Sequence, residues 1–303
     1  MGILTVGQFL ELENEVVELF DTRSAKFVDY MSQIFNVQDT DVTYEKHIAI
    51  GEFAIMTPWG GTVNYDGFSK GHDVERRVAK YSTGVQFEDA IFRYRKQYGQ
   101  IAERVNKAAT GVYKTVQTYA ASVFNNAFTV LPASGNIANP DAVALCSASH
   151  TYSPTDPTVQ GNTGVLDLDV ANLDATIDAM ANFKDDRGDL LTTVLPNILM
   201  VGNSQARLAK KLIGSDKEAF VNDNTVNLFK GELQVIVNPF ITGKKWFVAD
   251  GMAMADLLTF KFGRRAKPEK DSDFDTEVYK FKLVTEFMFG FDDWRFIYGQ
   301  NPA

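Results

Sequence analysis

Apolar residues at helical spacing predict one long helix in the middle of the chain. Between residues 100 and 127 they recur every three or four positions. The members of this stripe are Ile101, Val105, Ala108, Val112, Val116, Tyr119, Val123 and Ala127. A helix of this length extends about 40 Å. Gly111 inside it costs about 1 kcal/mol relative to alanine, so we expect a bend or a close packing contact there.

A shorter helical stripe lies near the N-terminus, with acidic residues between its apolar members. These members are Phe9, Leu12, Val16, Leu19 and Phe20. The stripe is too short to form a core alone, so it must dock on another surface. Residues 1–50 carry nine acidic and three basic residues, whereas residues 51–127 carry seven acidic and ten basic ones. This asymmetry predicts that the acidic arm lies along the middle segment of the same or a neighbouring chain.

Residues 51–84 have the composition of a long extended excursion. One proline and five glycines break any helix here: Pro58, Gly60, Gly61, Gly67, Gly71 and Gly84. The stretches 62–65 and 74–81 between them are strand-like. A glycine-rich loop of about 30 residues is unusual inside a compact domain and typically binds something.

The following segments alternate between helix and strand. Residues 129–165 are rich in Pro, Gly, Ser, Asn and Thr, and we interpret them as an irregular crossing. Next we expect a helix capped by Asp169 or Asn172, and a strand over 194–201 whose first half is irregular because of Pro196. A helix starting at Asn203 or Ser204 and ending at Gly214, and a strand over 233–237, complete a small α/β lobe.

The last segment predicts a return of the chain through further strands. We expect strands over 245–249, 278–286 and 294–298, with a short helix or turn over 252–258. Gly290 is predicted to form a turn or bulge between the last two strands, and residues 261–277 a charged hairpin.

Composition places the chain among globular proteins of one large or two modest domains. It has 303 residues, of which 45% are hydrophobic and 23% charged. The 23 Phe and 11 Tyr residues are suited either to a large core or to interfaces between subunits.

The net charge of −9 argues against a protein that grips nucleic acid, because such a protein needs a basic patch. It is compatible with an acidic wall around packed DNA. No run of 18 apolar residues and no signal peptide is present, so we expect no contact with a membrane. Cys146 is the single cysteine and is expected to be a buried thiol.

Catalytic and metal-binding patterns are not found in the sequence. His47, His72 and His150 lie far apart without metal-ligand spacing and are expected at the surface or at interfaces. The acidic run Asp271–Glu277 resembles a calcium loop, but Thr276 and Lys282 stand where Gly and Glu are required, so a charged hairpin tip is favoured. The acidic pairs Glu88-Asp89 and Asp185-Asp186 are interpreted as solvated turns. We therefore predict no catalytic residue, cofactor or metal, and keep a soluble α/β enzyme as a remote alternative.

The C-terminal part resembles one family closely. The carriers of the resemblance are Trp246-Phe247-Val248-Ala249-Asp250 and the end Gly290-Phe291-Asp292-Asp293-Trp294-Arg295-Phe296-Ile297-Tyr298-Gly299. They resemble the major capsid proteins of tailed bacteriophages with the HK97-like fold, and the order of the upstream segments agrees over nearly the whole chain. Trp246 and Trp294 are expected to be core anchors.

This resemblance implies an α+β fold with the parts of a shell subunit. The expected parts are an N-terminal arm (1–50), an extended loop (51–84), a peripheral domain (85–165) with a spine helix at about 100–127, an axial domain (166–244) and return strands (245–303) that complete the peripheral domain. The implied function is self-assembly of hexamers and pentamers into an icosahedral shell around double-stranded phage DNA, without sequence-specific binding. An encapsulin-like compartment is the alternative.

The resemblance also implies a location and partners. The protein would be part of the virion and would assemble in the cytoplasm of the bacterial host. We expect a portal protein as one partner. Because little chain precedes the loop, we also expect a separate scaffolding protein. The resemblance is also compatible with a decoration protein on the outside of the shell. No motif supports a covalent crosslink between Lys70 or Lys80 and Asn301. The candidate contacts between subunits are Trp59, Lys70, Arg76, Arg77, Arg264, Arg265, Asp273 and Asp275.

Overall fold

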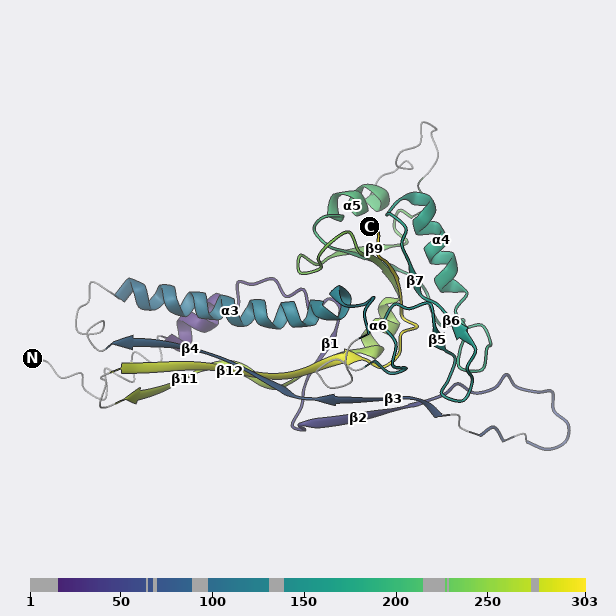
Figure 1. The fold of residues 1–303 in the computed structure, drawn as a ribbon, viewed down its shortest axis with the longest axis horizontal. Coiled ribbons are helices and arrows are strands. Elements are labelled where there is room, and N and C mark those ends of the chain that lie inside the picture. The colour runs from purple at the N-terminus through teal and green to yellow at the C-terminus, as the bar shows by residue number, and fades with distance from the viewer. Residues whose placement is uncertain are drawn as a thin grey trace, which may run out of the picture.

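The protein is elongated, with a long sheet at one end, a compact lobe at the other, and a hairpin that extends beyond the lobe (Figure 1). The structure is a computed structural model. It describes residues 16–63, 65–67, 70–88, 98–130, 139–214, 227, 229–273 and 278–303.

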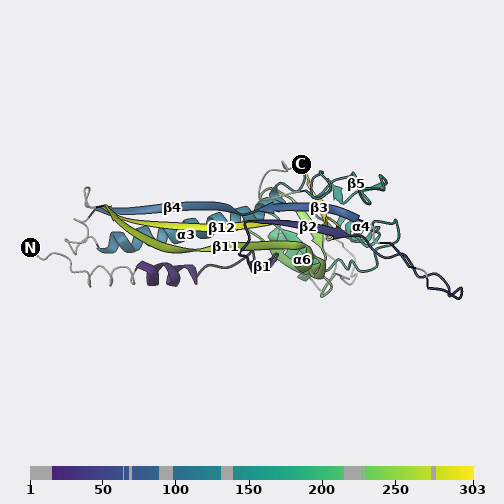
Figure 2. The ribbon, with the colours of Figure 1, turned by 90° about the horizontal axis from the view of Figure 1, so that it is seen from below.

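The long sheet has four strands in the order β1-β11-β12-β4. These are β1 (Asn36–Asp39), β11 (Leu258–Asp273), β12 (Val278–Phe291) and β4 (Ala79–Glu88). β11 and β12 pair antiparallel from Leu258↔Phe291 to Asp273↔Val278. The helix α3 (Tyr98–Asn125) runs along one face of this sheet (Figure 2), which confirms the predicted long helix.

Apolar side chains between α3 and the sheet explain why the long sheet forms. Phe281 and Leu283 of β12 are buried in a cluster with Val105 and Ala109 of α3, whereas Lys280 and Lys282, between and beside them, are exposed. This alternation follows the two-residue period of a strand. Each fully buried Phe or Leu contributes about 1.5–3 kcal/mol.

The N-terminal arm docks on this same cluster. Residues 16–24 are helical, and Val16 and Phe20 are buried against Phe87 and the residues of α3. Docking of the arm is therefore confirmed; Phe9 and Leu12 lie outside the described residues. The arm also lies along the middle segment, as predicted, and Oδ1 of Asp29 accepts from Nε2 of Gln117 in α3 at 2.9 Å. Two other acidic side chains contact β11: Asp39 pairs with Arg265 at 2.9 Å, and Glu45 pairs with Lys261.

The lobe contains a five-stranded sheet in the order β7-β13-β10-β8-β9. Its strands are β7 (Thr163–Gly164), β13 (Ile297–Gln300), β10 (Trp246–Ala249), β8 (Ile198–Val201) and β9 (Gln234–Val237). Its helices are α4 (Val170–Ala181), α5 (Ala206–Gly214) and α6 (Gly251–Leu257), and a two-stranded β5 (His150–Thr151) and β6 (Val159–Gln160) lies beside it.

Several local predictions for the lobe are confirmed. Asp169 caps α4 by accepting the N–H of Asn172 at 2.7 Å, which satisfies a free donor of the first turn. Pro196 precedes β8, as expected for a residue that cannot donate to a sheet. Trp246 and Trp294 are buried at 0% and 2% exposure, so both are core anchors.

The C-terminal segment contributes strands to both sheets. β10 and β13 belong to the lobe, whereas β11 and β12 form the long sheet. We expected all of residues 245–303 to complete the peripheral domain, which contains the long helix. Only β11 and β12 lie in the sheet beside that helix. The last strand, β13, also starts later than predicted, at Ile297.

The charged hairpin predicted over 261–277 is formed by β11 and β12, which pair antiparallel as far as Asp273↔Val278. Of its predicted tip, residues 274–277 lie outside the described part. The prediction for Gly290 is wrong. Gly290 is not a turn but lies inside β12. A Cβ at Gly290 would lie 2.9 Å from Nε of Arg76, so glycine is needed there for a close approach.

The extended hairpin consists of β2 (Tyr44–Ile50) and β3 (Lys70–Arg77), which pair antiparallel. Its strands start before residue 51, and β4 already belongs to the long sheet, so the hairpin is shifted toward the N-terminus relative to the predicted loop. Thr62, Val63 and Tyr65 are not in a strand, in contrast to the prediction for 62–65. Among the described helices, none is long and apolar enough to cross a membrane.

Candidate functional site

The extended hairpin carries a dense set of exposed apolar side chains. Met56 is 96% exposed and Trp59 73% exposed, although both belong to residue types that usually lose contact with water. The other exposed members of this set are Ile48, Ile50, Phe53, Ile55, Val63 and Tyr65. Many exposed apolar side chains on one hairpin indicate a binding surface, and we call these eight residues the apolar hairpin face.

Arg187 of the lobe fastens both limbs of the hairpin. Its Nε donates to the carbonyl oxygen of Glu52 at 2.7 Å, and its Nη2 donates to Oδ2 of Asp66 at 2.7 Å. Oδ2 of Asp66 also accepts the N–H of Ala54 at 2.8 Å. Beside Arg187, Oδ1 of Asp186 accepts the N–H of Glu52 at 2.9 Å. One turn of the lobe thus holds both limbs of the hairpin, from which it is 121 and 135 positions away in sequence.

A buried aspartate shapes the turn that carries Arg187. Asp185 is 8% exposed, and its Oδ1 accepts the N–H groups of Arg187 at 2.8 Å and Asp189 at 2.9 Å. Gly188 completes the turn at φ +86°, a conformation that favours glycine. The prediction of a solvated pair at Asp185-Asp186 is therefore wrong for Asp185, because the tight turn needs its carboxylate as an acceptor.

Substituting Arg187 with alanine is expected to loosen the hairpin without unfolding the subunit. The Arg187–Asp66 pair is partly exposed, and such pairs contribute little to overall stability. Hydrogen exchange at the amide of Ala54 should become several-fold faster, while the unfolding midpoint stays unchanged. Lys70→Ala is the matched control, since the ion pair of Lys70 with Asp73 lies within β3. Equal exchange at Ala54 in both variants would contradict the fastening role.

The same contact is expected to weaken in acid. The N–H of Ala54 and then the Arg187 guanidinium hold the pKa of Asp66 below its usual value. The contact is therefore fully present above the ordinary aspartate pKa of about 4 and is lost as the pH falls below that value. An NMR titration of the Ala54 amide should show a transition in this range. Asp66→Asn should abolish it; persistence of the transition in that variant would rule out Asp66 as its source.

A buried ion pair joins the hairpin to the body of the protein. Arg76 of β3 is 3% exposed. Its Nη1 donates to Oγ1 of Thr259 at 2.9 Å, and its Nη2 pairs with Oδ1 of Asp292. Arg76 thus links β3 to β11 and to the turn that follows β12. Removing one partner from such a pair leaves an uncompensated buried charge.

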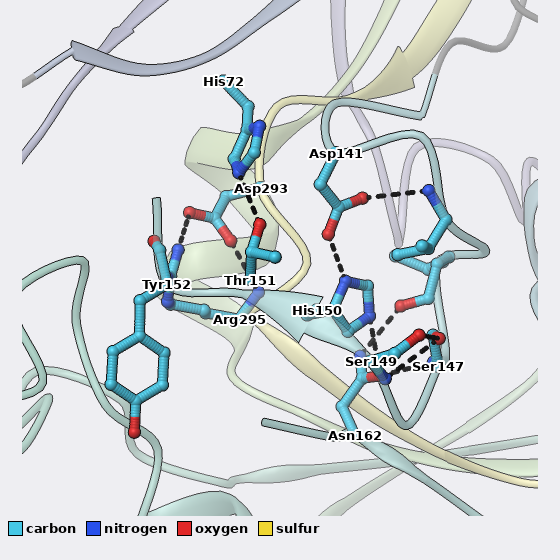
Figure 3. Close-up of polar contacts among 12 residues, drawn as sticks. His72, Asp141, Ser147, Ser149, His150, Thr151, Tyr152, Asn162, Asp293 and Arg295 are labelled. Atoms are coloured by element: carbon cyan, nitrogen blue, oxygen red, sulfur yellow. Dashed lines mark hydrogen bonds and ion pairs between the residues drawn. The ribbon is translucent and has the colours of Figure 1, made fainter. Parts of the chain in front are cut away.

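A buried histidine organises the base of the lobe (Figure 3). Nε2 of His150 lies 3.1 Å from Oδ1 of Asn162, and its Nδ1 pairs with Oδ2 of Asp141. The Nδ2 of Asn162 donates to the carbonyl oxygens of Leu145 and Ile297, so its Oδ1 must accept from the histidine. Both nitrogens of His150 therefore have hydrogen-bond partners, with Nε2 donating to Asn162 and Nδ1 bonded to Asp141. The ring also stacks on Trp294 at 4.2 Å. The expectation of a surface histidine is wrong here, because these partners satisfy the ring in the interior.

The Asp141–His150 pair resembles part of a hydrolase triad but lacks its chemistry. A general base needs a nitrogen within reach of a nucleophile, and both nitrogens of His150 are occupied while the residue is 0% exposed. Burial raises the pKa of the Cys146 thiol, which makes it inert as a nucleophile. Within the described ranges, no group of three or more His, Cys, Asp or Glu residues could hold a metal.

A cleft of about 400 Å³ separates the base of the hairpin from the lobe. His47 and His72 line it from the hairpin, and Tyr152, Asp293 and Arg295 line it from the lobe. Nε2 of His72 lies 3.3 Å from Oγ1 of Thr151, and burial lowers the pKa of His72. Arg295 donates to the carbonyl oxygens of Lys184 and Tyr152 at 2.9 Å each and pairs with Asp293 at 2.7 Å. The contacts of His72, Asp293 and Arg295 are structural, since each of these side chains has a partner within the chain.

The structure distributes the predicted contact residues over several surfaces. Trp59 is exposed on the apolar hairpin face, and Arg77 lies 5.6 Å above the ring of Tyr44. Arg76, by contrast, points into the subunit. Of the others, Lys70 pairs with Asp73 at 2.8 Å, Arg264 pairs with Glu269, Arg265 pairs with Asp39, Asp273 ends β11, and Asp275 lies outside the described residues.

The sequence matches the family model of phage capsid proteins over residues 73–299. This range covers most of the chain, from β3 to β13. The chain belongs to this family. A comparison with curated protein sequences finds no significant match.

Solved structures of capsids share the fold. The mature capsid of bacteriophage PhiM1 matches with a TM-score of 0.57 and 11% identity, over 91% of this chain and 88% of that one. The bacteriophage JBD30 capsid matches with a TM-score of 0.55 and 13% identity, over 80% and 100%. A virus-like particle from Pyrococcus furiosus matches with a TM-score of 0.53 and 8% identity, over 96% and 100%.

Family and fold together confirm the resemblance found in the C-terminal sequence. The chain is a major capsid protein of tailed phages with the HK97-like α+β fold. It is a structural protein of an icosahedral virion shell, and the family does not favour the encapsulin-like alternative.

Proposed function

We propose that the apolar hairpin face joins neighbouring copies of this capsid protein in the shell. The observation that carries this proposal is the exposure of eight apolar side chains on a hairpin that extends beyond the lobe (Figure 1). Residues 51–60 form no regular secondary structure, so their backbone is not committed to a sheet or helix of the subunit. A neighbouring copy can cover the exposed side chains and pair with this segment.

Within this proposal, the parts of the subunit take the roles of a capsid protein. The residues before β2 are the arm, the β2–β3 hairpin is the extended loop, and α3 with the long sheet is the peripheral domain. The lobe around α4 and α5 is the axial domain. Trp59 and Arg77 on the hairpin, with Lys70, Arg264 and Arg265, are the residues that we assign to contacts between copies.

The proposed shell is built from hexamers and pentamers and encloses double-stranded DNA without reading its sequence. Its acidic net charge suits a wall that holds DNA loosely. We propose assembly in the cytoplasm of the bacterial host, with a scaffolding protein, a portal protein and a decoration protein as partners. The role is non-enzymatic, in line with the occupied His150 and the inert Cys146.

Electron microscopy and size-exclusion chromatography of the purified protein test this function. We expect closed shells or rings of capsomers, with double-stranded DNA recovered from heads formed during infection. A protein that stays a monomer of 33.7 kDa at high concentration, both alone and in infected cells, would contradict the proposal. Particles that contain cargo protein in place of DNA would point to a compartment instead.

A further inference from the structure

The exposed face of α5 is wholly basic. Arg207, Lys210 and Lys211 face solvent, while the other side of the helix is buried against the lobe sheet. The buried residues are Ala209, Leu212 and Ile213. The adjoining turn adds the exposed Lys244, and this turn is held to the start of the helix by the bond from Oγ of Ser204 to the carbonyl oxygen of Gly243.

The exposed face of α4 has the opposite charge. Asp174 and Asp178 face solvent one turn apart, and Asp167 is exposed just before the helix. No Lys or Arg occurs between Val170 and Ala181. Leu173, Thr176 and Met180 bury the other side of the helix. The exposed positions between the acids are small, namely Ala171, Ala175 and Ala179, so long basic side chains can reach the carboxylates.

The two helices lie at opposite ends of the lobe sheet. α4 contacts β13, which neighbours β7 at one end of the strand order, and α5 contacts β8 and β9 at the other end. Figure 1 shows them on opposite flanks of the lobe. Copies placed side by side in one orientation therefore turn the basic flank of each toward the acidic flank of the next.

The charges at the centre of both faces have no ion-pair partner among the described residues. No salt bridge there involves Arg207, Lys210, Asp174 or Asp178. The subunit thus presents two surfaces of complementary charge. A head-to-tail contact between them repeats around a ring and closes when the rotation allows.

We propose that α5 of each copy docks on α4 of the neighbouring copy around a capsomer ring. This inference rests on the proposed assembly function. It names the surface that sets how neighbouring copies are oriented in the ring. Arginine and lysine against carboxylates favour the α5–α4 arrangement and disfavour α4–α4 or α5–α5 contacts, because like charges would then meet. The charge pattern thereby sets a single direction around the ring.

Charge reversal tests the docking. One variant carries Arg207→Glu and Lys210→Glu, and a second carries Asp174→Lys and Asp178→Lys. Each should keep the unfolding midpoint of the wild type, since these residues are exposed, but lose about tenfold or more of its yield of rings and particles. The chain with all four changes has the net charge of the wild type and should recover assembly. An equimolar mixture of the two double variants should also form rings, with an even number of copies.

The outcomes separate this inference from the proposed function. If the wild type assembles and either double variant assembles equally well, the α5–α4 contact is wrong and the assembly function stands. If the four-residue variant folds but assembles as poorly as the double variants, the charge pairing is likewise wrong. If the wild type itself forms neither rings nor particles under any condition tested, the proposed function fails and this inference fails with it.

Discussion

Replacing Arg76 with alanine is expected to lower the free energy of unfolding by about 3–5 kcal/mol. The substitution leaves the buried carboxylate of Asp292 without its partner and Thr259 without a donor. It also opens a void against Gly290, where the arginine side chain now packs. Denaturant unfolding of the unassembled subunit measures the change. The loss exceeds that of most single substitutions, because the carboxylate of Asp292 stays largely buried without its partner.

Neighbouring and compensating variants make the Arg76 prediction specific. Arg77→Ala removes an exposed arginine from the next position of the same strand and should change stability by less than about 0.5 kcal/mol. Arg76→Met combined with Asp292→Leu removes both charges and should recover most of the loss, since apolar replacements of a buried pair are often tolerated. If Arg76→Ala and Arg77→Ala both change the free energy of unfolding only slightly, the Arg76–Asp292 pair does not stabilise the junction between the hairpin and the body of the protein.

Replacing Trp59 with alanine is expected to abolish assembly while sparing the subunit. Trp59 is exposed in the isolated chain, so its loss should change the free energy of unfolding by less than about 0.5 kcal/mol. At an interface, a tryptophan of this kind is often a residue whose truncation costs about 2 kcal/mol or more. The contact recurs in every copy of a shell, so the effect on particle yield should be large.

Two matched variants separate this effect from a general loss of apolar surface. Trp59→Phe keeps an aromatic ring and should retain most of the particle yield. Met252→Ala removes a comparably exposed apolar side chain from α6, away from the hairpin, and should have a smaller effect. Particle counts by electron microscopy and light scattering give the yield. If Trp59→Ala assembles as fully as the wild type, Trp59 and its hairpin are not part of the interface between copies.

Periodicity and capping residues predict the helices and strands that are encoded by their own local sequence. α3 could be found because one apolar stripe covers its full length, and α4 because Asp169 caps it. The charged β11 could not be found this way. After Phe262 its residues carry no apolar alternation, and they are extended because β12 pairs with them.

The contacts of the candidate site depended on residues too far apart in sequence to be predicted. Arg187 reaches the carbonyl of Glu52, 135 positions away, and a single sequence holds no signal for that approach. The sequence predicts a turn at Asp185–Gly188, but it does not show that the buried carboxylate of Asp185 accepts backbone N–H groups of this turn. Similarly, the lack of metal-ligand spacing around His150 gives no sign that Asp141, Asn162 and Trp294 contact its ring in the interior.

Hydroxyl-radical footprinting of the hairpin in free subunits and in assembled particles tests the central claim most directly. Met56 and Trp59 are oxidised readily when exposed, and both are open to solvent in the isolated chain. If the apolar hairpin face joins neighbouring copies, oxidation of both residues should fall strongly on assembly, while that of exposed Met252 falls less. Equal oxidation of Met56 and Trp59 in subunits and particles would contradict the account.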